Sequence, residues 1–258
     1  MLDQSSIETL MDKAWPSLDR EESGAWVLRA SEGVTQRANS VWPRGLSAAA
    51  DGMDLVAAVR DASDWYRRRR LPLIFQVFHD ARSAGLNDVL DSLRFTRQSA
   101  TQIMVRTTAS LPSAVEGRVE LSPEPSTEWM DLWWSVDGRG GEREHGIARS
   151  ILSGCPSVYA LVRDSDGRPA AVGRLALADG WGGLYSMATS EGHRRRGFAS
   201  AVLAALLTEG GRLGLDGFWL LVTAANHGAQ ALYRGAGFVD HGSYLYRQAP
   251  LQRARSGC

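Results

Sequence analysis

Short apolar runs alternate with helically spaced apolar positions through the second half of the chain. Short runs bounded by turn residues are typical of buried strands, whereas an apolar residue every three or four positions indicates an amphipathic helix. Together they predict an α/β (α+β) fold with a mixed central sheet flanked by helices. The expected strands are 119–121, 158–162, 170–177, 184–188, 218–222 and 243–247, and the expected helices are 127–136, 145–152, 198–213 and 227–236.

The first half carries the same two kinds of pattern. In the segment 51–70, Leu55, Val59, Ala62 and Trp65 form one apolar stripe, which predicts a helix. We also expect helices at 5–15 and 87–94 and strands at 24–30, 36–42, 73–78 and 101–106, the first two strands being joined as a hairpin through Gly33.

A change of composition divides the two halves. Between residues 107 and 117 the chain is rich in Thr, Ser, Ala, Pro and Gly, which is typical of a linker. The sequence therefore predicts one domain at 1–110 and a second at 118–250, and residues 251–258 are expected to form a frayed tail.

The two halves also end alike. Each has a helix, a strand and a second helix that finishes in an aromatic residue, Phe95 in the first half and Phe238 in the second. Aligning these two residues puts Leu90 opposite Tyr233. This pattern indicates a repeat whose first copy is degenerate. The alternative, a chance likeness between generic helix–strand–helix units, stays open at this point.

Composition narrows the class of protein. The 258 residues have a formal net charge of zero, 44% hydrophobic and 22% charged residues, as in a globular protein. Zero net charge argues against a nucleic-acid binder that depends on overall electrostatics. No apolar run approaches the roughly 20 residues that span a bilayer, and the N-terminus lacks the features of a signal peptide. Two cysteines, Cys155 and Cys258, give neither a disulfide framework nor metal-ligand spacing, and a reducing cytoplasm is expected.

Candidate chemistry begins where the apolar run 184–188 meets the helix that starts near residue 198. Arg194, Arg195 and Arg196 precede Gly197 and Phe198-Ala199. The first turn of a helix presents backbone N–H groups and the positive end of its dipole, so it attracts phosphate. Gly197 and Ala199 keep side-chain bulk away from that backbone. The segment predicts a cradle for a diphosphate.

A second motif follows the next buried strand: Asn226, Ala229, Leu232, Tyr233, Gly237 and Phe238 stand at fixed spacing. Together with Arg-x-x-Gly-x-Ala at 194–199, this pattern resembles the GCN5-related N-acetyltransferase (GNAT) superfamily over residues 118–248. The resemblance extends to residues 1–107 only as a degenerate GNAT-like copy, a tandem arrangement known in some members. One departure is Glu191, where the family usually has proline, and we expect a less rigid loop there.

The resemblance implies that acetyl-CoA is the co-substrate. Its pantetheine arm would lie along the backbone of the fourth strand of the domain, and its pyrophosphate would meet the amides of residues 195–200. The implied cofactor-binding residues are Met187, Ala188, Thr189, Arg194, Arg195, Arg196, Gly197, Phe198, Ala199, Ser200, Asn226 and Tyr233.

The implied reaction is N-acetyl transfer to a primary amine. The amine would attack the thioester directly through a tetrahedral intermediate, whose oxyanion a backbone N–H near Met187 would stabilise. Tyr233 stands where the family places its general acid; packing in the core is the alternative role for that side chain. Glu142, Glu144 and His145 are candidates for the general base, and a solvated charged loop is the alternative interpretation.

The partner is expected to be a small-molecule amine in preference to a protein amine, with no nucleic acid, membrane or metal involved and with a monomer or homodimer as the assembly. A competing hypothesis is a regulatory module that binds acetyl-CoA without catalysis. A Rossmann dinucleotide site is a poor interpretation because the chain lacks Gly-x-Gly-x-x-Gly followed by an acidic residue.

Overall fold

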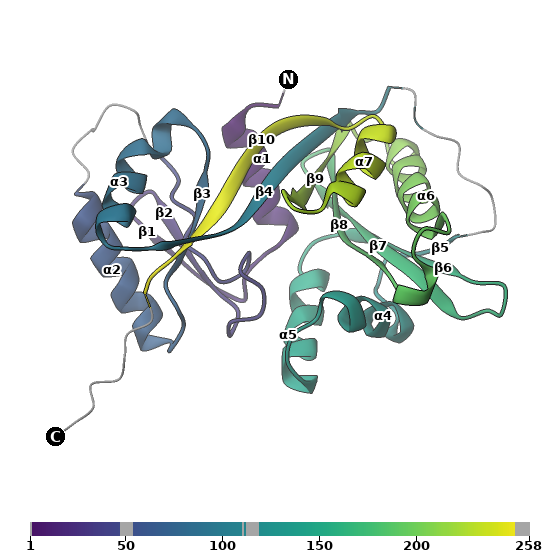
Figure 1. Ribbon diagram of the computed structural model, residues 1–258, viewed down its shortest axis with the longest axis horizontal. Helices are drawn as coiled ribbons and strands as arrows, with labels where there is room; N and C mark the ends of the chain where they lie inside the picture. The colour runs from purple at the N-terminus through teal and green to yellow at the C-terminus, as the bar shows by residue number, and fades with distance from the viewer. Residues whose placement is uncertain (1, 47–53, 110, 112–118, 251–258) are drawn as a thin grey trace. The chain divides into compact units, whose positions relative to one another are not determined.

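The computed structural model describes residues 2–46, 54–109, 111 and 119–250 and divides them between two compact units (Figure 1). Unit 1 contains residues up to Pro16 together with Gln102–His241, and unit 2 contains Ser17–Thr101 and the residues from Gly242 onward. The unit boundaries follow packing and differ from the predicted domains, because residues 2–16 belong with the second half of the chain. That the first half is a degenerate copy of the second stays a prediction.

Unit 1 holds most of the sheet and most of the helices. Its elements are α1 (Gln4–Ala14), β5 (Val119–Ser122), α4 (Thr127–Asp137), α5 (Glu142–Ser153), β6 (Ser157–Arg163), β7 (Pro169–Ala178), β8 (Trp181–Thr189), the 3-10 turn η2 (Glu191–His193), α6 (Phe198–Arg212), β9 (Gly217–Thr223) and α7 (His227–Gly235). The predicted strands and helices of residues 119–236 are all present, with ends that move by a few residues.

Unit 2 contains β1 (Asp19–Ser23), β2 (Trp26–Ala30), α2 (Leu55–Arg68), β3 (Ile74–Phe78), the 3-10 turn η1 (Ala81–Ser83) and α3 (Ala84–Ser92). Two long strands, β4 (Thr96–Thr107) and β10 (Val239–Gln248), contribute residues to both units. Hydrogen bonding connects eight strands in the order β3-β10-β4-β9-β8-β7-β6-β5, and only β1 and β2 form a separate ladder among the strands that the structure describes. The predicted mixed sheet is confirmed.

The core of unit 1 lies between β6–β9 and the two helices α6 and α7. Val202, Leu206 and Phe218 are fully buried there, and Tyr233 and Phe238 of the α7 region join the same cluster. Helix α4 also packs on β7 and β8. Its Trp129 donates from Nε1 to the carbonyls of Ala160 and Gly173 at 3.0 and 3.2 Å. Figure 1 shows α4 and α5 across the sheet from α6.

The parallel strands β8 and β9 separate partway along their length. Their pairing runs from Trp181 opposite Gly217 to Leu184 opposite Leu220 and ends there, although β8 continues to Thr189. Ser186 has a positive φ of 53°, and the register of β7 against β8 shifts between Val172 and Arg174. A bulge of this kind bends a strand and releases backbone groups from the ladder. It opens a gap between β8 and β9.

Residues 2–16 are tied to unit 1 by a buried arginine. The Arg174 side chain on β7 is fully buried, and it donates from Nη1 to the carbonyl of Ala14 and from Nε to Ser157 Oγ, each at 3.0 Å. Trp15 packs against Tyr185 of β8 with ring centroids 5.4 Å apart. The guanidinium therefore satisfies a helix-end carbonyl that would otherwise be buried without a partner.

Only the end of the hairpin predicted from 24–30 and 36–42 is present. Val27 pairs antiparallel with Trp42 through backbone hydrogen bonds of 2.9 and 2.8 Å, whereas residues 36–40 form no strand. β2 also pairs along its length with the charged strand β1, which the apolar pattern could not reveal because all residues of β1 are exposed. Asn39 stabilises the turn at 31–35: its side chain accepts from the amides of Ser31 and Gly33 and donates to the carbonyls of Val34 and Thr35. These backbone groups of the turn are thus satisfied by a side chain.

The aligned helix ends of the two halves share one local geometry. Phe95 donates its amide to Leu90 O at 2.9 Å, and Phe238 donates to Tyr233 O at 3.0 Å. The preceding residues, Arg94 and Gly237, both have positive φ, 59° and 84°. This likeness supports a repeat without establishing common descent. The predicted linker and tail lie largely outside the described residues, and among the described helices none is long and apolar enough to cross a membrane.

Gly173 gives a test of the packing that supports the bulge. A Cβ at this position would lie 2.5 Å from Met187 Sδ and 2.7 Å from Val202 Cγ1, so Gly173→Ala is expected to destabilise the fold by about 1–3 kcal/mol. The control is Gly146→Ala in α5, where a Cβ meets nothing within 4 Å and helix propensity predicts a gain of up to about 1 kcal/mol. The free energy of unfolding of both variants, measured with denaturant, tests this prediction. Equal values for the two variants would contradict the packing argument.

Candidate active site

A cavity of about 530 Å³ lies where β8, α6 and α7 meet. The predicted cofactor-binding residues line it with two exceptions, Ala188 and Arg196. Its complete lining is Met187, Thr189, His193, Arg194, Arg195, Gly197, Phe198, Ala199, Ser200, Asn226, Gly228, Ala229, Ala231, Leu232 and Tyr233. Residues predicted from two separate motifs are therefore brought to one site, and all of them belong to unit 1.

The turn into α6 builds the end of the cavity that is predicted to bind phosphate. Gly197 is the N-cap and has φ of +84°, a conformation that glycine adopts without strain. The first backbone hydrogen bond of the helix runs from Ala201 N to Gly197 O at 3.0 Å, so the amides of Ala199 and Ser200 precede the ladder. Among the described residues, Arg194 and Arg195 form no ion pair, and their side chains are exposed. This end of the cavity suits an anion.

The strand side of the cavity comes from the bulged end of β8. Met187 and Thr189 line it, whereas the Ala188 side chain is buried in the core. The alternation of a strand explains why neighbouring side chains point to opposite faces. Because β9 no longer pairs with this part of β8, backbone groups here can meet an extended ligand.

Opposite this strand, α7 carries the two candidate residues of the second motif. Asn226 is the N-cap, and its Oδ1 accepts from the amide of Ala229 at 3.1 Å. Tyr233 lies about two turns further along the helix on the same side and is 7% exposed. Burial, reinforced by the negative charge of Asp137, raises the pKa of Tyr233 to about 12. The hydroxyl therefore keeps its proton throughout the neutral range.

The candidate bases lie outside this lining. Glu144 accepts from the amide of Gly141 at 2.8 Å as part of a capping box that begins α5, and this hydrogen bond lowers the pKa of its carboxyl. Glu142 is exposed at the start of the same helix. His145 packs edge-on against Trp134 at 5.3 Å. The assignment of a base to Glu142 or Glu144 stays a prediction, to which the structure adds a capping role for Glu144.

The structure also brings forward residues that sequence reasoning undervalued. The side chain of His193 is only 18% exposed and lines the cavity. Asp137 ends α4, and its charge acts on Tyr233. Neither position carries a local sequence signal, because the partner of each lies far away in the chain. Gly228 and Ala231 also line the cavity, and they could have been predicted because they are small residues within the second motif.

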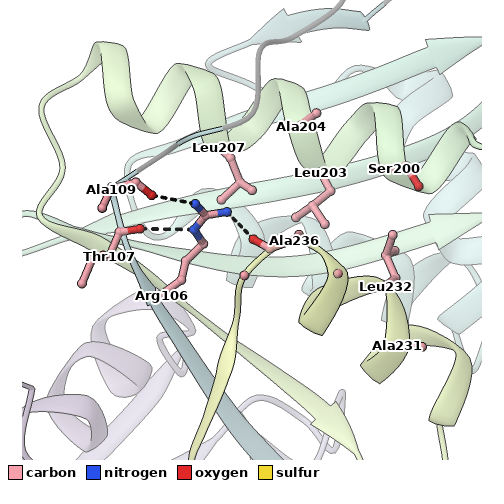
Figure 2. Close-up of a pocket in the computed structure, with 12 residues that line it drawn as sticks. Arg106, Thr107, Ala109, Ser200, Leu203, Ala204, Leu207, Ala231, Leu232 and Ala236 are labelled. Carbon is pink, nitrogen blue, oxygen red and sulfur yellow. Dashed lines mark hydrogen bonds between the residues drawn. The ribbon is translucent and has the colours of Figure 1, made fainter.

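A second cavity of about 730 Å³ adjoins the first and shares Ser200, Ala231 and Leu232 with it. Figure 2 shows Leu203 and Leu207 of α6 on one wall and Arg106 at one end. The guanidinium of Arg106 donates to the carbonyls of Thr107, Ala109 and Ala236. Since Ala236 is the C-cap of α7, a cation here also complements the negative end of that helix dipole.

No group of three or more His, Cys, Asp or Glu side chains is placed to hold a metal ion among the residues that the structure describes. The buried Cys155 is remote in sequence from both cavity motifs, and burial raises the pKa of its thiol.

Comparison with known proteins adds to this geometry. The model of the family described as "Probable histone acetyltransferase Rv0428c C-terminal" matches residues 4–247. The uncharacterized N-acetyltransferase YobR of Bacillus subtilis is 29% identical over 252 residues, which cover 96% of this chain and 99% of YobR.

Two solved structures share the fold over nearly the whole chain. A GCN5-related N-acetyltransferase from Kribbella flavida superposes with a TM-score of 0.68 at 18% identity, covering 96% of this chain and 94% of the other. A tandem GNAT protein from the clavulanic acid biosynthesis pathway gives a TM-score of 0.68 at 12% identity, covering 98% and 90%. The predicted fold and family resemblance are confirmed; the degenerate state of the first half stays a prediction.

The environment of Tyr233 predicts an unusual titration. An ordinary tyrosine ionises near pH ~10, and the raised pKa of about 12 means that Tyr233 stabilises the fold below pH ~10 and that this contribution is lost as the pH rises toward 12. Ultraviolet difference titration of the wild type against Tyr233→Phe should show one late tyrosinate signal. A difference signal centred at the ordinary value would contradict the burial argument.

Proposed function

Because the chain belongs to the Rv0428c C-terminal acetyltransferase family and is an N-acetyltransferase of the GNAT type, we propose that it moves an acetyl group from acetyl-CoA to a primary amine. The observation that carries this proposal is one cavity with an anion-binding helix start at one end and a protonated Tyr233 at the other. A coenzyme A thioester needs both a diphosphate site and a proton donor for its leaving sulfur.

The residues of the cavity fit coenzyme A. The amides of Ala199 and Ser200, with Arg194 and Arg195, would hold the pyrophosphate. The unpaired end of β8 would bind the amide groups of the pantetheine arm as an added strand does. The second cavity shares three lining residues with the first, so one ligand with a diphosphate in its middle can extend into both.

When bound, acetyl-CoA would supply an acetyl carbonyl carbon activated by sulfur. The neutral acceptor nitrogen would form a C–N bond with that carbon as the C–S bond breaks. A backbone N–H at the bulge near Met187 would donate to the carbonyl oxygen as it gains negative charge. The sulfur would leave with a proton, and the nitrogen would lose one to solvent or to a nearby carboxylate.

Tyr233 would act on the leaving sulfur. Its pKa of about 12 lies above the roughly 8.5 of an ordinary thiol, so complete transfer of its proton is uphill and a hydrogen bond to the sulfur would form first. Such a bond lowers the barrier because it strengthens as the thiolate charge develops. The raised pKa also ensures that the hydroxyl is not ionised before the reaction begins.

The acceptor is best explained as a cationic small-molecule amine. Asp137 ends α4, on the face of the sheet across from the helix pair, and its charge acts on Tyr233. A carboxylate whose charge acts on Tyr233 would favour an ammonium group at the reacting end of the cavity. The formal net charge of zero argues against a nucleic-acid partner. The proposed assembly is a monomer or a homodimer.

Thiol release from acetyl-CoA, measured across a panel of primary amines, tests the function. The wild type should turn over at least one amine, and Tyr233→Phe should lower kcat about 100-fold while the Kd for CoA changes less than twofold. A chain that binds acetyl-CoA tightly but turns over no amine would support the regulatory module instead. An unchanged kcat in Tyr233→Phe would remove this side chain from the chemistry.

Asp137→Asn tests the acceptor end. Loss of the carboxylate should raise the KM for a cationic amine about tenfold, leave the KM for acetyl-CoA unchanged, and shift the Tyr233 titration toward the ordinary value. The control is Asp88→Asn, an exposed carboxylate on α3 in unit 2 that lines neither cavity. Equal changes in both variants would mean that Asp137 acts only through general charge.

A further inference from the structure

Three side chains form a hydrogen-bonded chain beside the phosphate-binding end of the cavity. Ser190 Oγ lies 2.6 Å from His193 Nδ1, and His193 Nε2 lies 2.9 Å from Asp164 Oδ2. Asp164 comes from the turn between β6 and β7, whereas Ser190 and His193 flank the 3-10 turn that leads into α6. The imidazole thus joins two segments that are 29 residues apart in the chain.

Asp164 is well fixed at its own end. Its Oδ1 accepts from the amides of Asp166 and Arg168, both at 2.9 Å, and this leaves Oδ2 for the histidine. Its side chain is 9% exposed, and the backbone hydrogen bond from Arg168 contributes most to lowering the pKa of its carboxyl. The carboxylate is therefore a rigid, negatively charged anchor for the imidazole N–H.

The other face of the imidazole reaches the start of α6. Its ring centroid lies 5.4 Å from that of Phe198, with the planes 81° apart. Arg196 in turn lies over the Phe198 ring at 5.5 Å. Since Phe198 is the first residue of α6 and lines the cavity, His193 connects the hairpin to the residue whose position sets the helix start.

The loop needs such a support. Residues 194–196 are three consecutive arginines that repel each other, and Arg195 carries a positive φ of 63°, which costs a non-glycine residue energy. Glu191 stands at the position expected to rigidify the loop, and it is exposed. Without a fixed partner the loop would lose conformational entropy on binding an anion, which lowers affinity.

We propose that Asp164 and His193 are positioning residues that hold loop 190–197 in the conformation that binds the diphosphate of the acyl donor. The inference rests on the proposed coenzyme A site, and it assigns to these side chains no contact with the reacting atoms. Their effect falls on donor affinity and not on the transfer step.

The same three side chains do not form a nucleophilic site. Ser190 is absent from the cavity lining, and its Oγ also lies 3.4 Å from the carbonyl of Ala170, to which the amide of Ser190 already donates at 3.0 Å. The hydroxyl therefore faces the edge of β7 and not the ligand space. A Ser–His–Asp arrangement requires an accessible hydroxyl and nearby oxyanion donors.

The test is the Kd of the full-length chain for CoA, measured by calorimetry in the wild type, His193→Ala, Asp164→Ala and His79→Ala. His193→Ala and Asp164→Ala should each raise the Kd about tenfold, which corresponds to about 1.4 kcal/mol, while kcat at saturating acetyl-CoA stays within about twofold. His79 is an exposed histidine outside both cavities, and its replacement should leave the Kd unchanged.

Conservative variants separate positioning from folding. The amide nitrogen of His193→Gln can still donate to Asp164, so its Kd should lie between those of the wild type and His193→Ala. In hydrogen exchange of the free protein, the amides of 191–197 should exchange faster in His193→Ala while those of α6 beyond its first turn do not. Faster exchange throughout unit 1 would mean general destabilisation and would overturn the proposal.

The two proposals fail in different ways. If the wild type binds CoA and His193→Ala binds it equally well, the positioning role is wrong and the coenzyme A site stands. If the wild type does not bind CoA, the proposed function fails, and hydrogen exchange still decides whether His193 holds the loop: unchanged exchange at 191–197 overturns that role.

Discussion

The separation of β8 from β9 is the constraint on which the site depends. A parallel pair that continued past Leu184 and Leu220 would satisfy its backbone groups internally and leave no room for a ligand between the strands. The bulge at Ser186 prevents this, and Gly173 on the neighbouring strand makes room for the displaced Met187 side chain. The opening at the β8 end of the cavity is therefore built into the sheet itself.

Helix α7 is held at both ends across this opening. Asn226 caps its first turn, and Arg106 binds the carbonyl of its C-cap residue Ala236. Between these fixed ends the ring of Tyr233 is buried beside Phe238, with centroids 6.1 Å apart. In the proposed role of proton donor, a side chain fixed by its own helix would lose little entropy during a reaction, which distinguishes a buried tyrosine from an exposed one.

Sequence patterns predicted most of the fold and only part of the site. Apolar periodicity located the strands and helices of residues 119–236, because the helices carry an apolar stripe and the central strands are buried along almost their whole length. It missed β1, since Asp19–Ser23 is wholly exposed, and it made the strand at 36–42 too long, since only Val41 and Trp42 form β-bridges there. The predictions for the diphosphate cradle at 194–199 and for Tyr233 came from sequence motifs. No motif pointed to Asp137 or His193, because each acts through a residue distant in the chain.

The anchoring of Ala14 by Arg174 has a consequence for how the protein is made. Unit 1 draws on residues near the start of the chain and on residues 102–241, and unit 2 uses β10 residues after 242 to pair with β3. Neither unit can complete its packing until almost all of the chain has left the ribosome. The apolar face of helix α1 therefore stays uncovered until Arg174, 160 residues after Ala14, has been synthesised.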